Sequence, residues 1–336
     1  MPELQNLRRD IKAGEQVVVG FSGGADSVML AELLRTLRDE LDFSPTLVHV
    51  NHLLRGEESD GDEAFCLRYA ADHDFQMITR RVDVGALAEE RKISPETAGR
   101  QARYAVFREV METLGATKLV LAHNLDDQVE TFLFRLIRGT SLEGLEGIPE
   151  SGEILRPLAW RWKRDICAWL REHGLSWRED RSNNDPGYTR NRIRLELIPG
   201  IERTYNPRFK EKIAALLPEI RAINRMTAVD AEAYFAEPDN NRALSLSALK
   251  ELALREPLRL RKILRDWLLR IPAPLGRNGL DRSKLEALAR IVTAGGAKEI
   301  TLGGGYSVRK TKDRLTLCGP KTKNEEENTP PKAFSE

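Results

Sequence analysis

The chain has 336 residues, 41% of them hydrophobic and 31% charged, and its net charge at pH 7 is +1. This composition is typical of a soluble globular protein with two domains, and the small net charge does not by itself indicate a polyanionic partner. No run of about 18 apolar residues occurs, and the N-terminus lacks the pattern of a signal peptide, so neither a membrane span nor secretion is expected. Three widely spaced cysteines favour reduced thiols and therefore a cytoplasmic protein: Cys66, Cys167 and Cys318.

The first half of the chain alternates short apolar runs with amphipathic helical patterns. The predicted strands are Gln16–Phe21, Thr46–Asn51, Gln76–Val82 and Lys118–His123, with a fifth near Gly152–Arg156. The helical patterns between them include Glu63–Asp72 and Thr97–Leu114. This alternation predicts right-handed crossovers and an α/β fold, with a doubly wound, parallel, five-stranded sheet covered on both faces. Ligands of such sheets bind at the carboxyl ends of the strands.

The alternation stops after about residue 200. Apolar positions at helical spacing predict that residues 206–270 are mostly helical and that Leu285–Val292 forms another helix. Glu299–Thr301 and Tyr306–Arg309 flank a glycine-rich turn and predict a short β hairpin, and Asp313–Leu317 is a candidate third strand.

Three segments follow from this division of the chain. We expect a first domain over residues 1–200 and a smaller, mainly helical domain over residues 201–318. Residues 319–336 are charged and contain proline, which predicts a disordered tail.

A glycine-containing loop follows the first predicted strand and precedes a helical pattern. Its residues are Ser22, Gly23, Gly24, Ala25, Asp26 and Ser27. Two glycines let the backbone pass close to an anion, and the N–H groups of the loop and of the first helical turn favour a phosphate. The loop has neither the lysine of a Walker A loop nor the spacing of a dinucleotide fingerprint. It can hold a pyrophosphate unit with Asp26 on Mg²⁺, or it can be an ordinary Gly-Gly turn. The loop resembles the PP-loop of the ATP pyrophosphatases.

A group of carboxylates follows the fourth predicted strand, where an apolar stripe predicts a helix beginning near Asp126. Asp127 and Glu130 share a face of that helix, and Asp126 is also a neighbour of Glu130. Single carboxylates are ordinary at a helix N-terminus because they suit the helix dipole. Three within five residues exceed what capping requires, and such a group can bind Mg²⁺ or an amine, or take a proton.

Several motifs in chain order resemble those of the tRNA(Ile)-lysidine synthetases. His123–Thr131 is similar to the element H-H-x-D-D-Q-x-E-T of that family, except that Asn124 stands at the second histidine. Arg135–Gly139 is similar to the R-L-x-R-G element that follows it. The other matching segments are His49–Arg55, Glu96–Tyr104, Glu179 with Asp180 and Asn183, and Tyr188–Arg194. The chain resembles the short form of the family, which lacks an extra C-terminal domain.

The resemblance implies a PP-loop fold of the adenine nucleotide alpha-hydrolase type and an ATP-dependent carbon–nitrogen ligase that acts on tRNA. In the family, ATP adenylates the C2 oxygen of the wobble cytidine in the CAU anticodon of tRNA(Ile). The ε-amine of free L-lysine then displaces AMP, and the lysidine product changes the codon read from AUG to AUA. The implied cofactors and partners are ATP, Mg²⁺, free lysine and the tRNA, with residues 201–318 as a tRNA-binding domain, and we also consider a homodimer.

The resemblance also assigns roles to individual residues. The predicted nucleotide-binding residues are Ser22, Gly23, Gly24, Ala25, Asp26, Ser27, Asn51, His52, Arg100 and His123. The predicted catalytic residues are Asp26, Asp127, Glu130 and Arg103, and the candidate Mg²⁺ ligands are Asp26 and Asp126. The predicted tRNA-binding residues are Arg178, Arg190, Arg192 and Arg194. Arg100 and Arg103 share a helix face, which can hold phosphates or the target cytidine, or be a solvated basic face.

The basic stretch between residues 156 and 194 favours contact with RNA phosphates. Its interleaved tryptophans, Trp160, Trp162 and Trp177, either stack on bases or belong to the core. For His49, His52 and His123, hydrogen bonding and packing are favoured over a zinc site, because zinc needs a fuller set of ligands.

Two functions other than the ligase are alternatives for this sequence. One is another PP-loop enzyme, such as a tRNA 2-thiolase or NAD synthetase. The thiolases rely on paired cysteines, which this chain lacks, and NAD synthetase is not expected to carry the Asp126–Thr131 or Arg190–Arg194 segments. The other is a non-catalytic, nucleotide-gated tRNA-binding protein, which the presence of Asp26, Asp127 and Glu130 disfavours.

Overall fold

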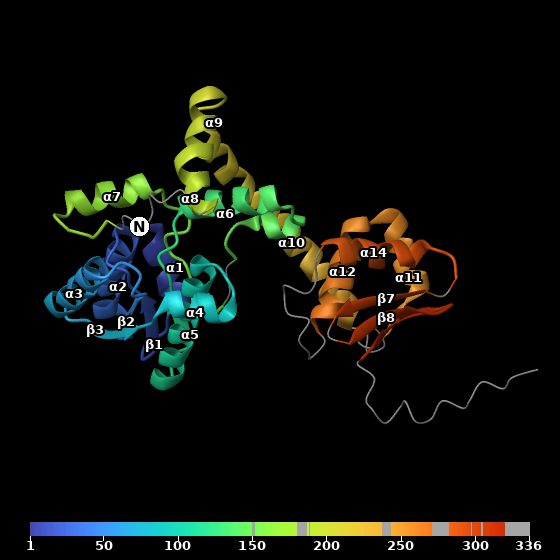
Figure 1. Cartoon of the computed structure of the whole chain (residues 1–336), viewed down its shortest axis with the longest axis horizontal. Helices are drawn as coiled ribbons and strands as arrows, with labels where there is room; N and C mark the ends of the chain where they lie inside the picture. Colours follow the sequence, from blue (N-terminus) through green and yellow to red (C-terminus); the bar gives the residue numbers. More distant parts are fainter. Residues whose placement is uncertain are drawn as a thin grey trace, which may run out of the picture. The chain divides into compact units, whose positions relative to one another are not determined.

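The computed structural model divides into two compact units (Figure 1). It describes residues 1–149, 152–179, 187, 189–236, 243–270, 282–296, 298–303 and 305–319. The first unit comprises Met1–Gly139 and Gly144–Leu217, and the second comprises Thr140–Glu143 and Pro218–Glu336. The division falls inside one long helix, α10 (Phe209–Ala236), which contains Pro218. The first unit therefore continues past residue 200, and residues 320–336 of the expected tail lie outside the described residues.

The first unit contains a five-stranded sheet in the order β3-β2-β1-β4-β5, with every neighbouring pair parallel. The strands are β1 (Gln16–Gly20), β2 (Ser44–Asn51), β3 (Gln76–Arg81), β4 (Lys118–Val120) and β5 (Ile154–Leu155). The predicted doubly wound parallel sheet is thereby confirmed. β2 and β3 extend to one side of β1, whereas β4 and β5 extend to the other. The chain thus changes direction between β1 and β4, and ligands of such sheets bind at that point.

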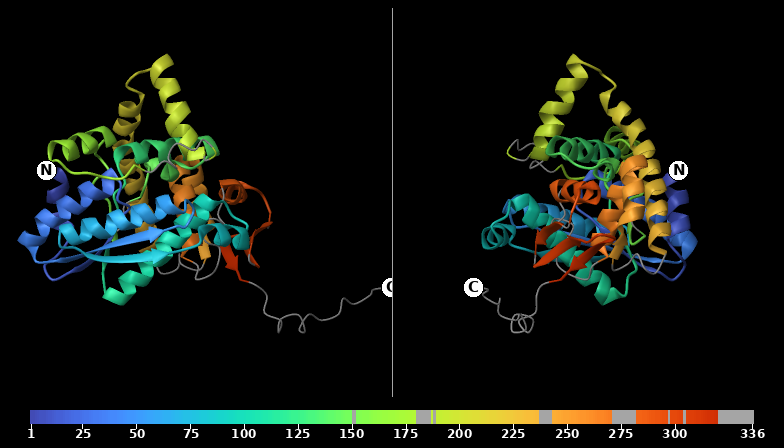
Figure 2. Two further views of the ribbon diagram at one scale, coloured as in Figure 1. Left: turned by 60° about the vertical axis from the view of Figure 1, so that its left-hand side comes forward. Right: turned by 90° about the vertical axis from the view of Figure 1, so that its right-hand side faces the viewer.

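Helices cover both faces of this sheet (Figure 2). They are α1 (Pro2–Asp10), α2 (Ala25–Leu41), α3 (Glu57–Asp72), α4 (Val84–Arg91), α5 (Pro95–Leu114), α6 (Leu125–Arg138) and α7 (Lys163–Glu172). A 3-10 turn, Leu142–Glu146, follows α6. Further along the chain come α8 (Thr189–Arg192), a π-helical turn at Ile193–Leu197 and α9 (Ile198–Thr204).

Successive side chains of β1 point to opposite faces of the sheet, so its valines pack in two different hydrophobic cores. Val17 and Val19 lie in the cluster built on α1, α2 and α7, whereas Val18 packs with Phe107 and Val110 of α5. All three valines are at most 1% exposed. Burial of a side chain of this size contributes about 1.5–3 kcal/mol, so the two faces hold β1 rigidly behind the loop that follows it.

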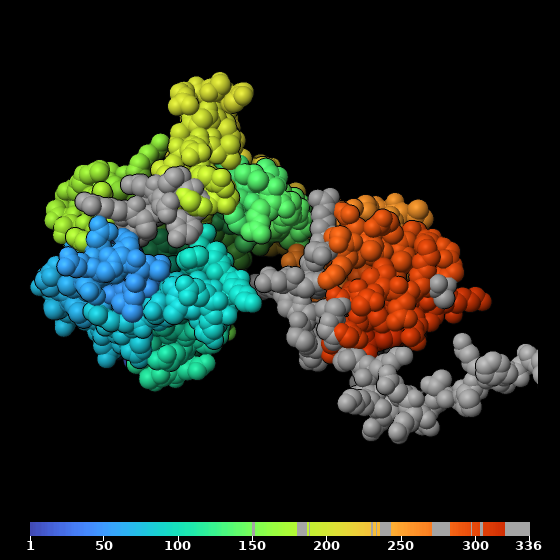
Figure 3. All heavy atoms as spheres, viewed as in Figure 1, coloured from blue at the N-terminus to red at the C-terminus, as the bar shows by residue number. Residues whose placement is uncertain are grey.

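The second unit combines helices with a four-stranded antiparallel sheet in the order β6-β9-β8-β7. Its further helices are α11 (Leu246–Arg255), α12 (Pro257–Leu269) and α14 (Arg282–Thr293). Its strands are β6 (Ala243–Ser245), β7 (Lys298–Gly303), β8 (Tyr306–Lys310) and β9 (Arg314–Cys318). The expected hairpin and third strand are present. Figure 3 shows one face of this unit in orange and red.

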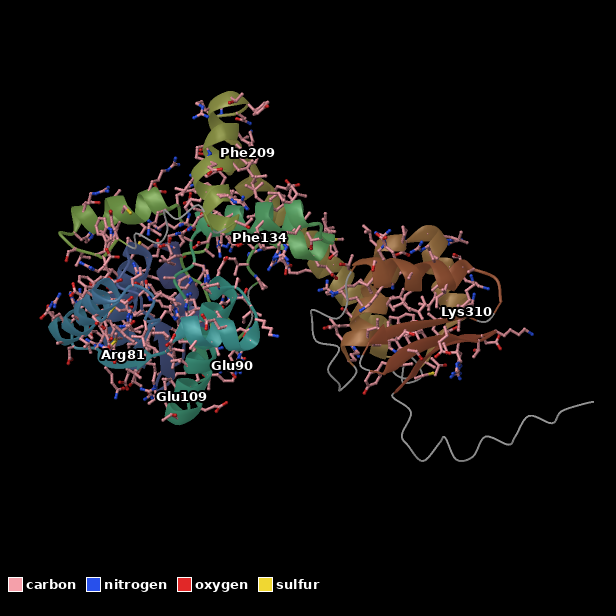
Figure 4. All side chains as sticks on the ribbon, in the orientation of Figure 1. Arg81, Glu90, Glu109, Phe134, Phe209 and Lys310 are labelled. Carbon is pink, nitrogen blue, oxygen red and sulfur yellow. The ribbon has the colours of Figure 1, made fainter. Side chains whose placement is uncertain are left out.

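The described residues of 206–270 are mostly helical, as predicted, with the strand β6 between α10 and α11. Only three residues pair with β9, which is too short a segment for any periodicity to be recognised, and Leu244 at its centre is fully buried. On β8, the buried Lys310 (labelled in Figure 4) donates its ammonium to the carbonyl oxygen of Ala294. None of the described helices has both the length and the hydropathy of a membrane span.

Candidate active site

The loop after β1 is shaped by Gly23, whose φ is +77°. A Cβ atom at this position would lie 3.0 Å from the ring of Phe65 and 3.2 Å from Sγ of Cys66, so the loop requires glycine there. The Ser27 hydroxyl donates to the carbonyl oxygen of Gly24 (2.9 Å) and accepts from the amide of Ser22 (3.3 Å). Among the described residues no side chain caps α2, so the first amides of this helix remain open to an anion.

Asp26 lies on the first turn of α2 and joins the loop to α7. Its Oδ2 accepts a hydrogen bond from Nζ of Lys163 at 2.8 Å. Its Oδ1 is buried and has no hydrogen-bond partner among the described residues. Burial raises the pKa of Asp26, while the Lys163 ammonium acts in the opposite direction. A buried carboxylate oxygen without a partner is a suitable ligand for a hard cation, so Asp26 fits the predicted Mg²⁺.

The helix α6 begins with a reciprocal cap between Asn124 and Asp127. Oδ1 of Asn124 accepts from the amide of Asp127 (3.0 Å), and Oδ2 of Asp127 accepts from the amide of Asn124 (2.9 Å). Asn124, which stands where the family has a second histidine, therefore helps to fix the start of the helix.

Asp126 makes two hydrogen bonds to lysines. Its Oδ2 accepts from the backbone amide of Lys163 (2.9 Å), and its Oδ1 accepts from Nζ of Lys210 (2.8 Å). Both of its oxygens are thus engaged, whereas one oxygen of Asp26 is not. Of the two candidate Mg²⁺ ligands, Asp26 is the one with a carboxylate oxygen that makes no hydrogen bond to a described residue.

Glu130 lies on α6, the helix on which Phe134 is labelled in Figure 4, and its side chain is 1% exposed. Arg194 donates Nε to Oε1 at 2.6 Å and Nη2 to Oε2 at 2.9 Å. Arg190 adds longer bonds, from Nε to Oε2 of Glu130 (3.2 Å) and from Nη2 to Oδ1 of Asp127 (3.3 Å). Burial raises the pKa of Glu130, and the guanidinium of Arg194 opposes this rise. Two arginines predicted to bind tRNA thus pair with two carboxylates predicted to be catalytic.

The predicted histidines occupy different environments. Nδ1 of His123 lies 3.3 Å from Nε of Arg156, and burial lowers the pKa of His123 to about 4, so its ring is neutral at pH 7. Nδ1 of the buried His49 lies 3.1 Å from the carbonyl oxygen of Phe21 and 3.4 Å from Sγ of Cys66. His49 therefore matches the packing alternative. Among the described residues no group of three His, Cys, Asp or Glu side chains is arranged to hold a metal.

Other predicted site residues have local structural partners. The buried amide of Asn51 donates to Oε2 of Glu63 (2.9 Å) and accepts from the backbone N–H of Leu53 (3.0 Å). Arg178 donates Nε to Oδ1 of Asp62 (2.8 Å), and its backbone amide donates to Gly23 (2.9 Å). The backbone of Arg178 therefore lies against the loop that follows β1. 

The remaining predicted residues lie closer to solvent. Arg192 is exposed and contacts Thr189, and the guanidinium of Arg100 lies over the ring of Tyr104 on α5. Arg103 is exposed on the same helix, and His52 is partly exposed. Trp177 packs against the core, which was one of the two alternatives for the tryptophans. Trp160 is 43% exposed. Asp180, Asn183 and Tyr188 of the predicted motifs lie outside the described residues.

Lys163, which belongs to the basic stretch, lies at this site, a position that the sequence did not predict. Its backbone bonds to Asp126 and its side chain to Asp26, so it connects the ends of β1 and β4. The position of Lys163 directly before an amphipathic helix was visible in the sequence. Its distance from Asp26 was not, because the two residues are 137 positions apart.

Residues 2–201 match the model of the PP-loop domain family. The chain belongs to the PP-loop family. This PP-loop protein is 42% identical over 198 residues to the tRNA(Ile)-lysidine synthase of Clostridium acetobutylicum, a match that covers 58% of this chain and 43% of that one. It is 42% identical over 206 residues to the synthase of the same name from Geobacter sulfurreducens, covering 60% of this chain and 43% of the relative. The chain thus spans less than half the length of these two relatives.

A longer match extends into the second unit. The tRNA(Ile)-lysidine synthase of Clostridioides difficile is 29% identical over 328 residues, which cover 96% of this chain and 70% of that protein. Among solved structures, the U34-tRNA thiolase NcsA of Methanococcus maripaludis, with its [4Fe-4S] cluster, has a TM-score of 0.53 and 18% sequence identity. The match covers 66% of this chain and 77% of the thiolase, and it shows a shared fold.

Proposed function

We propose that this chain attaches lysine to the wobble cytidine of tRNA(Ile) with a CAU anticodon, and that it consumes ATP to do so. The observation that carries the proposal is the bridge made by Lys163. This residue bonds to Asp26 in the PP-loop and to Asp126 beside the carboxylate pair of α6, at 2.8 and 2.9 Å respectively. The glycine loop and the carboxylates of α6 are therefore linked by one residue, which supports a two-step adenylation and amine transfer at a single site. We propose a cytoplasmic location, because ATP, lysine and tRNA are all present there.

In the first step, the C2 oxygen of the cytidine attacks the α-phosphorus of ATP. The bond from this phosphorus to the bridging oxygen breaks, and pyrophosphate leaves. The uncapped amides of α2 and the glycine loop would stabilise the negative charge on the phosphates. Bound Mg²⁺ would neutralise part of that charge, and Asp26 would hold the ion through its open carboxylate oxygen. Backbone N–H groups would thus replace part of the phosphate contacts that the lysine of a Walker A loop makes in other proteins.

In the second step, the ε-nitrogen of lysine attacks C2, the bond between C2 and its oxygen breaks, and AMP leaves. The lysine ammonium must first lose a proton. Asp127 and Glu130 would bind the ammonium and accept this proton, and the burial that raises the pKa of Glu130 makes it a stronger base. Arg190 contacts both carboxylates through bonds of 3.2 and 3.3 Å, which are longer than those of Arg194. We infer that the substrate amine replaces Arg190 rather than Arg194.

The tRNA would contact exposed basic side chains of the first unit. Arg178, whose side chain is 45% exposed, and the exposed Arg192 are available for phosphate contacts even though each has a protein partner. We propose the second unit as a further tRNA-binding surface. The homodimer considered above is tested by sedimentation equilibrium.

The thiolase alternative conflicts with the cysteines. The solved thiolase carries a [4Fe-4S] cluster, and such clusters are held by several cysteine thiolates. This chain has three cysteines in all, of which Cys66 is buried and Cys318 belongs to the second unit. The first unit therefore has too few thiolates to hold a cluster in the same way.

The deciding experiment is incorporation of labelled lysine into a tRNA(Ile) transcript with a CAU anticodon, in the presence of ATP and Mg²⁺. The initiator methionine tRNA serves as the control substrate. Label on the isoleucine transcript alone supports the proposal. Release of pyrophosphate that depends on tRNA but leaves no label would indicate a different nucleophile. A folded protein that gives neither signal would refute the proposed reaction and favour a binding protein.

A further inference from the structure

The PP-loop of this chain contains one acidic side chain and no basic one, although its proposed ligand is a polyanion. Asp26 carries negative charge into the region where the phosphates of ATP would lie. Backbone amides and a magnesium ion offset only part of the repulsion. A cationic side chain from elsewhere in the fold would offset more of it.

Lys163 is the described cation that reaches this loop through a bond of 2.8 Å to Asp26. Its main chain is anchored, because its own amide is bound by Asp126 at 2.9 Å and it is the first residue of α7. α7 itself is fixed by Ile166 and Leu170, which are fully buried in the core beneath α2. The base of the side chain is therefore held in place, while its ammonium lies at the loop.

Stability alone does not account for this ion pair. The Lys163 side chain is 42% exposed and that of Asp26 25%, and ion pairs with such access to solvent contribute only about 0–1 kcal/mol. The geometry leaves the second oxygen of Asp26 without a partner, so the pair is not a closed structural salt bridge. An ammonium that is partly exposed, anchored at its base and adjacent to a phosphate loop has the properties of a ligand-binding group.

We propose that Lys163 binds the pyrophosphate part of ATP, supplying from α7 the cation that the loop sequence lacks. The inference rests on the proposed use of ATP by this chain. In the nucleotide-free protein, Asp26 holds the Lys163 ammonium beside the PP-loop, where the phosphates would bind. When ATP binds, the outer phosphates take over hydrogen bonds from the Lys163 ammonium, and Asp26 becomes available to the metal ion.

The test compares the binding of ATP, inorganic pyrophosphate and AMP by calorimetry, with Mg²⁺ and without tRNA. Lys163→Gln should weaken ATP and pyrophosphate binding about tenfold or more, because a charged hydrogen bond is lost, and should change AMP binding by less than about twofold. Lys163→Arg keeps the charge and should retain ATP affinity within about threefold. Arg164→Gln removes the same charge one residue away, from a side chain that is 68% exposed, and should behave as the wild type.

Equal weakening of ATP and AMP binding by Lys163→Gln would overturn the proposal, since it would indicate a general effect on the fold. Unchanged pyrophosphate binding would also overturn it, as would a wild-type chain that does not prefer ATP to AMP. Thermal denaturation of each variant verifies that the protein is folded. A wild-type chain that binds ATP through Lys163 but attaches no lysine to tRNA would contradict the proposed function and leave this assignment intact.

Discussion

Arg194 holds Glu130 through two hydrogen bonds, from Nε to Oε1 at 2.6 Å and from Nη2 to Oε2 at 2.9 Å. Arg194 comes from the π-helical turn after α8, which lies beside α6 (Figure 1). Glu130 is almost completely buried, which raises its pKa, and the hydrogen bonds from Arg194 oppose this rise by favouring the charged carboxylate. This ion pair joins Glu130, a proposed catalytic residue, to a turn near the C-terminal end of the PP-loop domain.

Removal of Arg194 should destabilise the first unit through Glu130. We expect Arg194→Ala to lower the free energy of unfolding by about 1–3 kcal/mol at pH 7, because a buried carboxylate loses its main partner. Adding Glu130→Gln should recover part of the loss, since no buried charge is then left unpaired. Urea unfolding of the two single variants and the double variant measures this coupling. Strict additivity of the two effects would show that the pair does not act as a unit.

Glu130→Gln should impair the second step of the proposed reaction more than the first. We expect lysine transfer to fall by roughly 10²–10⁴-fold, the usual contribution of a general base, while tRNA-dependent release of pyrophosphate persists. Rapid-quench assays that follow labelled ATP and labelled lysine separate the two steps. Glu109→Gln, on an exposed pair with Arg80, is the matched control. A Glu130→Gln enzyme with wild-type lysine KM and turnover would remove Glu130 from the mechanism.

Asp26→Asn should abolish the effect of Mg²⁺ on ATP binding. The wild type should bind ATP more tightly when Mg²⁺ is added, because the open oxygen of Asp26 can hold the ion. The variant lacks this charge and should show little difference with and without the metal, whether measured by calorimetry or by fluorescence. Asp39→Asn, on the same helix and 74% exposed, should respond to Mg²⁺ as the wild type does. The same response in Asp26→Asn would exclude Asp26 as the ligand.

His123 should make the fold sensitive to acid. Burial lowers its pKa from 6.5 to about 4, so on acidification the unfolded chain takes up this proton before the folded chain does. The contribution of the neutral His123 ring to the free energy of unfolding is therefore fully present above about pH 6.5. It is lost as the pH falls towards 4. His123→Asn keeps a hydrogen-bond acceptor for Arg156 and does not titrate. Urea unfolding at pH 7 and pH 5 should show a smaller loss of stability for the variant, and equal losses would contradict the prediction.

Substitution by alanine should lower stability at Gly23 but not at Gly24. Gly23→Ala places a side chain at φ +77° and 3.0 Å from Phe65, which should cost about 1–3 kcal/mol of stability. Gly24 has φ −75°, and its Cβ would meet no atom closer than 3.4 Å, so Gly24→Ala should fold normally. Thermal denaturation of the two variants tests this difference. Equal melting temperatures would mean that the loop adjusts to a Cβ at Gly23.

The parallel sheet could be predicted from the sequence because each of its strands carries its own local signal. The apolar runs at residues 16–21 and 46–51 bound β1 and β2 to within two residues, and the fifth strand was expected where β5 lies. β6 was not predicted, because it lies outside the alternating half of the chain and its pairing with β9 joins residues far apart in the sequence. Short strands depend on partners that a local pattern does not contain.

The candidate site was predictable to a similar degree. The phosphate loop and the carboxylates of α6 each form a contiguous motif, and their position after β1 and β4 brings them to one edge of the sheet. The partners of these residues come from distant segments. Arg190 and Arg194 were expected to face tRNA, yet both contact Glu130. The packing of α8 and the π-helical turn against α6 decides this, and no local pattern encodes it.

The sequence by itself determined the alternating strands and helices of the first half, the phosphate loop, the carboxylate helix and the family to which they point. These features depend on neighbours in the chain, where spacing alone sets which side chains share a face or a turn. The tertiary structure decided which charges meet. Lys163 reaches Asp26 across 137 residues, and Arg194 reaches Glu130 across 64, because α7 and the turn after α8 fold onto the same edge of the sheet. Ion pairs act through space, so only the folded chain could assign them.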